Sequence, residues 1–278
     1  MLAVLFSAAV NAALFTLSED LPKILEKASM SVISGDKSPE AHQEAASSAD
    51  DSPKIAIVID DCGANMNLAR RVLSSGVPLT WAIIPNLKYS GDTAELLREA
   101  GVPFLIHVPM QAEVDLPGKA GPRGPYRIGT GMSRDEVREV LIPIFDSMEG
   151  AFGVNNHRGS KATSDRGVMD AVMEVIAERN LFFLDSRTSS HSVAYDSALK
   201  HGLSAAYNSR FLDGESDWDK IASRMREALK LAQSKGTIAV ICHLRPDTVS
   251  FLESFAGELK KGNHKSGVKF ITLSEWPD

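Results

Sequence analysis

Apolar residues follow two different rhythms along the chain from residue 54 onward. Short runs rich in β-branched residues, typical of strands buried on both faces, alternate with longer stretches whose apolar positions recur with a helical period. The predicted strands are Ile55–Ile59, Leu79–Ile84, Phe104–Val108, Ala151–Asn155, Leu181–Leu184, Leu203–Tyr207, Thr237–Cys242 and Val268–Leu273. The predicted helices include Asn67–Ser74, Thr93–Ala100, Ser133–Met148, Asp165–Arg179, Asp217–Ser234 and Asp247–Lys260. Seven or eight strand–helix units in one run predict a (β/α) barrel or a related parallel sheet.

Local end signals sharpen the boundaries of these helices. Ser133, followed three residues later by Glu136, forms a capping box ahead of one helix. Glycines stand where several helices should end, at Gly76, Gly101, Gly202 and Gly236. The segment 111–131 interrupts the alternation with three prolines and five glycines, so we expect a long loop after the third strand. In a barrel, such a loop would overhang a site at the strand ends.

The N-terminal part of the chain has a different character. Residues 1–15 are almost wholly apolar and uncharged, but a membrane span needs about 20 such residues. The segment fits the apolar core of a signal peptide or anchor, although it lacks preceding basic residues; a buried helix is the alternative. We therefore predict a signal peptide or membrane anchor at 1–18, a flexible polar linker at 19–53, and one barrel domain at 54–276. The protein should be exported, either to the periplasm or tethered to the inner membrane and facing the envelope.

Composition narrows the choice of partners. The net charge of −6 and the isoelectric point near 5.7 argue against a nucleic-acid partner, which would require a concentrated basic surface. The two cysteines, Cys62 and Cys242, form neither a disulfide framework nor a zinc-finger spacing. The sequence gives no indication of the oligomeric state.

Adjacent carboxylates, Asp60 and Asp61, end the first apolar strand. The carboxyl ends of parallel strands are where α/β proteins place their chemistry. Two such carboxylates can both bind one metal ion, or one can bind the ion while the other acts as a base. The structural alternative is a helix cap, in which an aspartate satisfies free backbone N–H groups at a strand-to-helix turn.

Further polar residues fall at the ends of other predicted strands. They are His107, the run Asn155–Ser160, the run Asp185–Thr188, Asn208, Arg210, Asp213 and the run Cys242–Pro246. One buried histidine can be a satisfied core residue, but three histidines and two aspartates at one end of a barrel favour a site. Asp, His and His suit Zn²⁺ or a similar divalent ion with open positions. The second carboxylate could accept a proton from water or orient the ligand histidine, and His243 could protonate a leaving group. This set predicts a metal-dependent hydrolase that acts on an amide or an ester.

The same residues resemble the divergent polysaccharide deacetylase family, a distant branch of the carbohydrate esterase family-four deacetylases. The resemblance covers about Pro53 to Trp276 and rests on Ile59-Asp60-Asp61-x-Gly63, His107-x-Pro109-Met110, Asn155-Asn156-His157-x-Gly159-Ser160, Phe183-Leu184-Asp185-Ser186-Arg187-Thr188 and His243-x-Arg245-Pro246. It implies a distorted (β/α)7 TIM-like barrel and a divalent metal, usually taken as zinc. One departure is that the main branch has both metal histidines in one short motif, whereas here they lie on separate strands.

The resemblance also implies roles for individual residues. Asp61, His107 and His157 would hold the metal, with Asp60 as general base and His243 as general acid. Arg187 would orient Asp60 or meet the developing oxyanion. The candidates for substrate binding are Asn156, Ser160, Arg245 and, on the long loop, Tyr126, which Arg123 and Arg127 flank.

Three functions compete at this stage. The leading hypothesis is an exported metal-dependent hydrolase that removes acetyl groups from an envelope or extracellular polysaccharide. The second is a non-catalytic glycan-binding or scaffold protein of the envelope on the same barrel. A phosphoacceptor domain, which can also pair two aspartates at a first strand, fits less well because such folds have five strands and are about half this length.

Overall fold

The computed structural model describes residues 52–115, 127–261 and 266–277. The predicted segment 1–18, nearly all of the predicted linker 19–53, and Tyr126 lie outside the described residues. Within the described ranges, no helix is both long enough and apolar enough to cross a bilayer.

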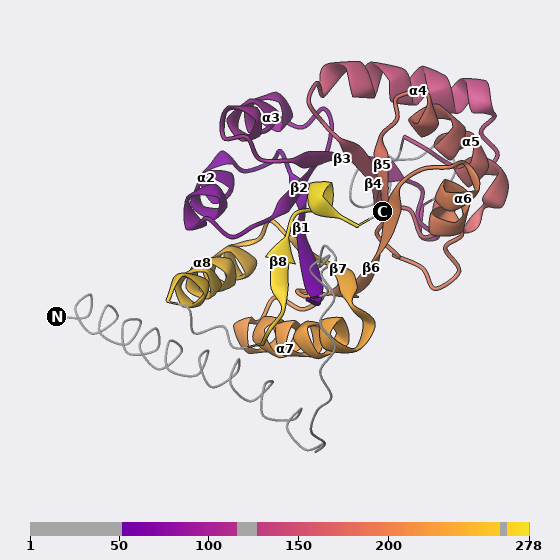
Figure 1. Cartoon of the computed structure of the whole chain (residues 1–278). Helices are drawn as coiled ribbons and strands as arrows, with labels where there is room; N and C mark the ends of the chain where they lie inside the picture. Colours follow the sequence, from indigo (N-terminus) through magenta and orange to yellow (C-terminus); the bar gives the residue numbers. More distant parts are fainter. Residues whose placement is uncertain (1–51, 116–126, 262–265, 278) are drawn as a thin grey trace, which may run out of the picture.

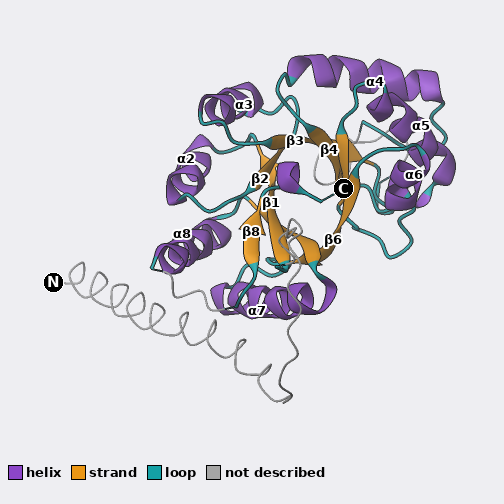
Figure 2. Ribbon diagram, in the orientation of Figure 1, coloured by secondary structure: helices purple, strands orange, loops and turns teal. Residues whose placement is uncertain are grey.

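Strands and helices alternate through these residues (Figures 1 and 2). The strands are β1 (Lys54–Cys62), β2 (Thr80–Ile83), β3 (Phe104–Met110), β4 (Gly153–Arg158), β5 (Phe182–Asp185), β6 (Ala205–Phe211), β7 (Thr237–His243) and β8 (Lys269–Ile271). The α-helices are α2 (Met66–Ser75), α3 (Ser90–Glu99), α4 (Arg134–Ser147), α5 (Arg166–Ala177), α6 (Ala194–Lys200), α7 (Trp218–Lys235) and α8 (Pro246–Lys260). Short 3₁₀ turns lie at Ala162–Ser164 and Leu273–Glu275.

The strands close into a parallel barrel. Neighbouring strands pair in the order β2-β3-β4-β5-β6-β7-β1, and β1 returns to β2 to close the ring. Strand β8 shares one edge of β1 with β2, because it pairs with Lys54–Ala56 while β2 pairs from Val58 onward. The predicted (β/α)7 barrel in a single domain is confirmed.

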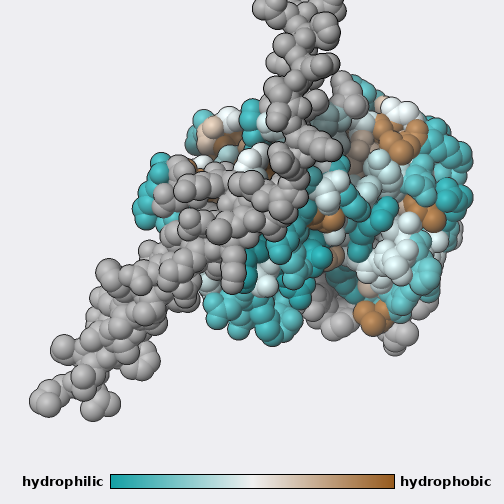
Figure 3. Space-filling view, turned by 60° about the horizontal axis from the view of Figure 1, so that its bottom comes forward, coloured by the Kyte–Doolittle hydropathy of each residue, from teal (hydrophilic) through white to brown (hydrophobic). Residues whose placement is uncertain are grey.

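Apolar residues pack on both sides of the barrel wall. The barrel interior holds mainly small or aliphatic side chains, including Ala56, Val58, Leu105 and Leu184. A larger apolar layer lies between the strands and the helices, and Figure 1 shows that the helices surround the barrel. The surface in Figure 3 is mostly hydrophilic where it is coloured, with small apolar patches between polar residues. The two apolar layers hold the strands in place, and the carboxyl ends of these strands carry the polar residues.

Several element ends shift by a few residues, as in β6, which runs to Phe211 instead of 207, and two further differences have a clear cause. Strand β4 runs from Gly153 to Arg158 rather than from 151 to 155, because its polar end remains paired with β3 up to Arg158. The second is α6, which the sequence pattern did not predict. Its seven residues make about two turns, too few for a helical period to stand out.

Candidate active site

The inward positions of the strands change from apolar to polar toward their carboxyl ends. Side chains alternate between the two faces of a strand, so every second residue points into the barrel. The inward series are Ala56, Val58 and Asp60 on β1, Leu105 and His107 on β3, Gly153, Asn155 and His157 on β4, and Ala239, Ile241 and His243 on β7. One end of the barrel interior therefore carries a layer of titratable and amide groups above an apolar core.

Asp61 joins this layer because the backbone departs from regular strand geometry. Its φ is +62°, in the left-handed region, and the β1–β2 register shifts between Ile59 and Cys62. A non-glycine residue in that region costs of the order of 1–3 kcal/mol. Gly63 follows with φ +107°, and a side chain there would meet the Ser90 hydroxyl at 2.9 Å. The turn brings two consecutive carboxylates to one site instead of opposite faces.

Three potential ligand atoms converge there. The Nδ1 atom of His157 lies 3.1 Å from Asp61 Oδ1 and 3.1 Å from His107 Nε2. The distance from His107 Nε2 to Asp61 Oδ1 is 3.5 Å. Asp61, His107 and His157 form the group of described residues whose ligand atoms could share one ion.

The geometry of these atoms fits a divalent cation. Ligands about 2.0–2.1 Å from a tetrahedral zinc ion lie roughly 3.3–3.4 Å from one another, close to the distances between the three atoms. Asp61 Oδ1 is buried and accepts no hydrogen bond from the described residues. Burial raises the pKa of Asp61, but the imidazoles of His107 and His157 outweigh it and hold that pKa well below its usual range. An ionised oxygen that accepts no hydrogen bond, together with two ring nitrogens, can donate lone pairs to a cation.

Asp60 lies beside the three ligands in a different environment. Its carboxylate is almost fully buried, and its Oδ2 atom lies 3.6 Å from His107 Nε2. Its Oδ1 atom accepts a hydrogen bond of 2.9 Å from Asn155. Burial raises the pKa of Asp60, although His107 and His243 nearby lower it. The two neighbouring aspartates thus have pKa values shifted in opposite directions, as expected for a base and a ligand with different tasks.

His243 is held by a second buried aspartate. Asp213 Oδ1 lies 2.8 Å from His243 Nδ1, and Asp213 Oδ2 accepts hydrogen bonds from His243 N and Thr248 Oγ1. The Phe211 ring stacks on the imidazole at a centroid distance of 5.9 Å. Burial lowers the pKa of His243, but the Asp213 carboxylate more than compensates and raises it above the ordinary value. Since Nδ1 donates to Asp213, the Nε2 atom of His243 is free to exchange a proton.

All of these groups border one cleft. Its volume is about 380 Å³, and its lining residues are Asp60, Asp61, His107, Asn156, His157, Arg158, Ser186, Thr188, Phe211, Gly214, His243 and Arg245. Arg245 donates to the backbone carbonyl of Asp213. Arg158 pairs with the buried carboxylate of Asp115, so the Arg245 guanidinium is the lining cation without a carboxylate partner among the described residues.

Two sequence-predicted residues, Ser160 and Arg187, are not among the residues that line the cleft. Ser160 accepts a hydrogen bond from Glu113 N and is not among the lining residues. Arg187 lies over the Tyr207 ring, 4.0 Å from its centroid, with Nε 3.9 Å from Asp185 Oδ2. The expected contact of Arg187 with Asp60 is not formed. Its backbone is in the left-handed region, with φ +48°. Tyr126 lies outside the described residues.

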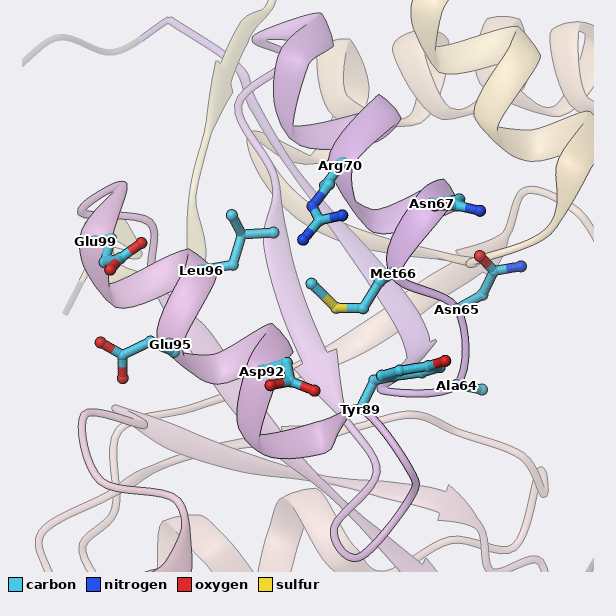
Figure 4. A pocket seen from close by; sticks show the side chains of 10 residues that line it. All are labelled: Ala64, Asn65, Met66, Asn67, Arg70, Tyr89, Asp92, Glu95, Leu96 and Glu99. Atoms are coloured by element: carbon cyan, nitrogen blue, oxygen red, sulfur yellow. The ribbon is translucent and has the colours of Figure 1, made fainter.

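Another cavity, of about 710 Å³, lies between α2 and α3 (Figure 4). Its walls carry Arg70 on α2 and Asp92, Glu95 and Glu99 on α3. It contains neither a histidine nor a buried carboxylate. The residues suited to metal-assisted chemistry therefore gather in the smaller cleft at the strand ends.

Comparison with known proteins agrees with this arrangement. Residues 57–276 match the family described as divergent polysaccharide deacetylase. The chain belongs to the divergent polysaccharide deacetylase family. The resemblance found in the strand-end motifs is thereby confirmed, and the match spans nearly the whole barrel of this deacetylase-family protein.

Two sequence relatives and one solved structure are similar to this chain. An uncharacterised protein of Haemophilus influenzae is 32% identical over 72% of this chain and 70% of its own length. The uncharacterised protein YibQ of Escherichia coli K12 is 31% identical over 74% of this chain and 63% of its own. The crystal structure of the uncharacterised protein ATU2773 from Agrobacterium tumefaciens C58 has a TM-score of 0.70 at 19% identity, covering 82% of this chain and 91% of that one. The last similarity shows the fold alone.

Two functional candidates, Asn155 and Asp213, have no individual role among the sequence-based predictions. Asn155 belongs to a strand-end motif, and because it lies two residues before His157 on the same strand, it shares the inward face. Asp213 follows a predicted strand, but its position in the sequence indicates no partner. Its partnership with His243 joins two residues that are 30 positions apart, and only the closed barrel brings them together.

Proposed function

We propose that this protein is an exported, metal-dependent hydrolase that removes acetyl groups from a cell-envelope or extracellular polysaccharide. The observation that carries the proposal is the convergence of the Asp61, His107 and His157 ligand atoms between Asp60 and His243 in one cleft. Membership of the divergent polysaccharide deacetylase family supports the class of substrate.

The ligand set supports a divalent metal, and zinc in particular. Two imidazole nitrogens and one carboxylate oxygen are ligands that zinc commonly takes in catalytic sites, where a further position stays open. A cation held there would polarise the acetyl carbonyl and lower the pKa of a nearby water. Asp61, His107 and His157 would hold it. Asp60 would not serve as a ligand: its Oδ1 atom accepts a hydrogen bond from Asn155, and its Oδ2 atom is left for proton transfer.

The remaining residues supply proton transfer. Asp60 Oδ2 would accept the proton of the attacking water, and a buried base with a raised pKa suits this step near neutral pH. His243 would then donate the Nε2 proton to the departing sugar nitrogen or oxygen. Asp213 raises the pKa of His243, which favours the protonated ring, and fixes the ring through Nδ1. The two groups therefore perform opposite proton transfers in one cleft.

Contacts to the substrate would come from the polar rim. Asn156 lines the cleft, although its side chain is engaged with Ser186 N and the Arg158 carbonyl. Arg245 could bind an anionic or hydroxyl group of the glycan. Tyr126 stays a candidate for stacking on a sugar ring.

The decisive test is acetate release. Full-length protein loaded with zinc would be incubated with an N-acetylglucosamine pentamer and with purified peptidoglycan, and acetate would be measured enzymatically. We expect release by the wild-type protein and its loss in Asp60→Asn at unchanged metal content. Glycan binding without acetate release, and unaffected by Asp60→Asn, would favour the non-catalytic glycan-binding alternative.

Export is a separate part of the proposal and rests on the apolar residues 1–15. Fractionation of cells that express the full chain, with and without residues 1–18, tests it. We expect the full chain in the periplasmic or inner-membrane fraction and the truncated chain in the cytoplasm. Full chain recovered from the cytoplasm would refute export.

A further inference from the structure

Asn155 joins the two halves of the candidate site through one amide group. Its Nδ2 atom lies 2.9 Å from Asp60 Oδ1 and 3.2 Å from Ser186 Oγ, while its Oδ1 atom lies 2.8 Å from His107 Nδ1. The side chain is fully buried on β4. An amide has two N–H donors and a carbonyl acceptor, so each of the three partners meets a group of the amide with which it can form a hydrogen bond.

The chemistry of the partners fixes which way the amide faces. An ionised carboxylate only accepts hydrogen bonds, so the NH₂ group must face Asp60. The amide oxygen then faces His107 and can only accept, which requires a proton on His107 Nδ1. In the neutral imidazole the lone pair of His107 consequently lies on Nε2, the atom directed at Asp61 and His157.

The same amide also selects the working oxygen of Asp60. Because Asn155 donates a hydrogen bond to Oδ1, that oxygen is the less basic of the two. The oxygen that faces His107 Nε2 and the cleft is Oδ2. One uncharged side chain thus determines both the ligand atom of His107 and the basic atom of Asp60.

We propose that Asn155 is a positioning residue that orients His107 for metal binding and Asp60 for proton transfer at the same time. The second half of this statement rests on the proposed function, whereas the first half concerns metal binding alone. Partners that orient a metal-bound histidine through its other ring nitrogen typically change metal affinity by about 10–100-fold when they are removed.

Two substitutions separate the roles. In Asn155→Asp, the new carboxylate can still accept from His107 Nδ1, but when ionised it cannot donate to Asp60. In Asn155→Ala, both contacts are lost. Asn208 is the matched control. It is a buried asparagine that donates to the Ser186 carbonyl from the adjoining part of the wall, with neither His107 nor Asp60 among its partners.

The experiment measures zinc affinity of the full-length variants by competition with a chromophoric chelator, with folding checked by thermal unfolding. We expect Asn155→Ala to bind zinc about 10–100-fold more weakly, with Asn155→Asp close to wild type. Asn208→Asp and Asn208→Ala should both bind zinc as the wild type does. Wild-type affinity in folded Asn155→Ala, or an equal loss in Asn155→Ala and Asn155→Asp, would overturn the orientation of His107.

Acetate release by the same samples tests the second role. Asn155→Asp should retain zinc yet release acetate far more slowly than the wild type, because Asp60 has lost its donor. Full activity in zinc-loaded Asn155→Asp would refute the role toward Asp60. If the wild type itself released no acetate while the zinc affinities followed the expected pattern, the proposed function would fail and the orientation of His107 would stand.

Discussion

Asp60 and Asp61 are consecutive in the chain, yet both carboxylates approach the same nitrogen of His107, at 3.6 and 3.5 Å. The left-handed backbone of Asp61 makes this possible, since a regular strand would place the two side chains on opposite faces. Burial raises the pKa of Asp60, whereas the pKa of Asp61 is held low by the two histidines. Adjacent residues of one type therefore have different chemical tasks.

This difference predicts opposite phenotypes for two isosteric substitutions. Asp60→Asn should keep its zinc and lose acetate release by about 100- to 10,000-fold, the range expected when a general base is removed. Asp61→Asn should lose zinc itself, because a neutral amide oxygen is a poorer ligand. Metal content by elemental analysis, with acetate release on the same samples, checks both. Equal metal loss in the two variants would contradict the division of roles.

Removal of either ligand histidine should abolish stoichiometric metal binding. His107→Ala and His157→Ala each leave two protein ligands in place of three, too few for a stable zinc site. His201→Ala is the matched control, since His201 lies at the end of α6 and contacts Ser197 rather than the cleft. Elemental analysis after dialysis measures the effect. Full zinc occupancy in both cleft variants would show that the ligands are assigned wrongly.

The pairing of His243 with Asp213 predicts a shift in the pH dependence of activity. A general acid must be protonated, so activity should fall as pH rises through the pKa of His243. Asp213 raises that pKa above its ordinary value near 6.5. Asp213→Asn should therefore move the alkaline limb of the kcat/KM profile to lower pH, as measured by acetate release across pH 5–10. If the alkaline limb stayed at the same pH in Asp213→Asn, His243 would not be the group that controls it.

The same pair predicts how stability depends on pH. The raised pKa of His243 contributes stability that is fully present below about pH 6.5 and is lost as pH rises through the folded-state pKa. The lowered pKa of Asp213 contributes stability that is present above about pH 3.9 and is lost as pH falls through its folded-state pKa. The stability difference between wild type and Asp213→Asn, from urea unfolding, should thus be largest between about pH 4 and 6.5. A difference that grew with pH above that window would contradict the pairing.

Much of the site could be predicted because the relevant signals are local. Buried strands are readable as apolar runs, and a charged or imidazole residue at the end of such a run stands out, as Asp60, His107 and His243 do. The barrel then follows from the regular alternation of strands and helices. The alternation of side chains along a strand also predicts that Asn155 points inward, because His157, two residues later, lies on the same face.

Other features depend on backbone turns and long-range contacts. No local signal in the sequence reveals the left-handed backbone of Arg187, or that its guanidinium lies over Tyr207. Asp213 reaches His243 only because β6 and β7 are neighbours in the barrel. Such relationships belong to the closed barrel, whose strand ends form the site from separate parts of the chain.

We predict that the stability of the barrel wall beneath the site depends strongly on one glycine, Gly153. A Cβ atom at Gly153 would lie 2.6 Å from the Phe182 carbonyl oxygen and 2.8 Å from Leu105 Cδ2. Gly153 shares the inward face of β4 with Asn155 and His157, so a shift of the strand would also displace these groups. Gly153→Ala should destabilise the fold by about 1–3 kcal/mol through overpacking. It should also weaken zinc binding.

Gly257 provides the control, because it lies in α8 and a Cβ atom there meets nothing within 4 Å. Gly257→Ala should stabilise the protein by about 0.5–1 kcal/mol, the usual gain for alanine over glycine inside a helix. Urea unfolding and zinc affinity of both variants test the comparison. If Gly153→Ala were as stable as the wild type and bound zinc equally well, the close packing of β4 against β3 and β5 would not be what holds Asn155 and His157 in place.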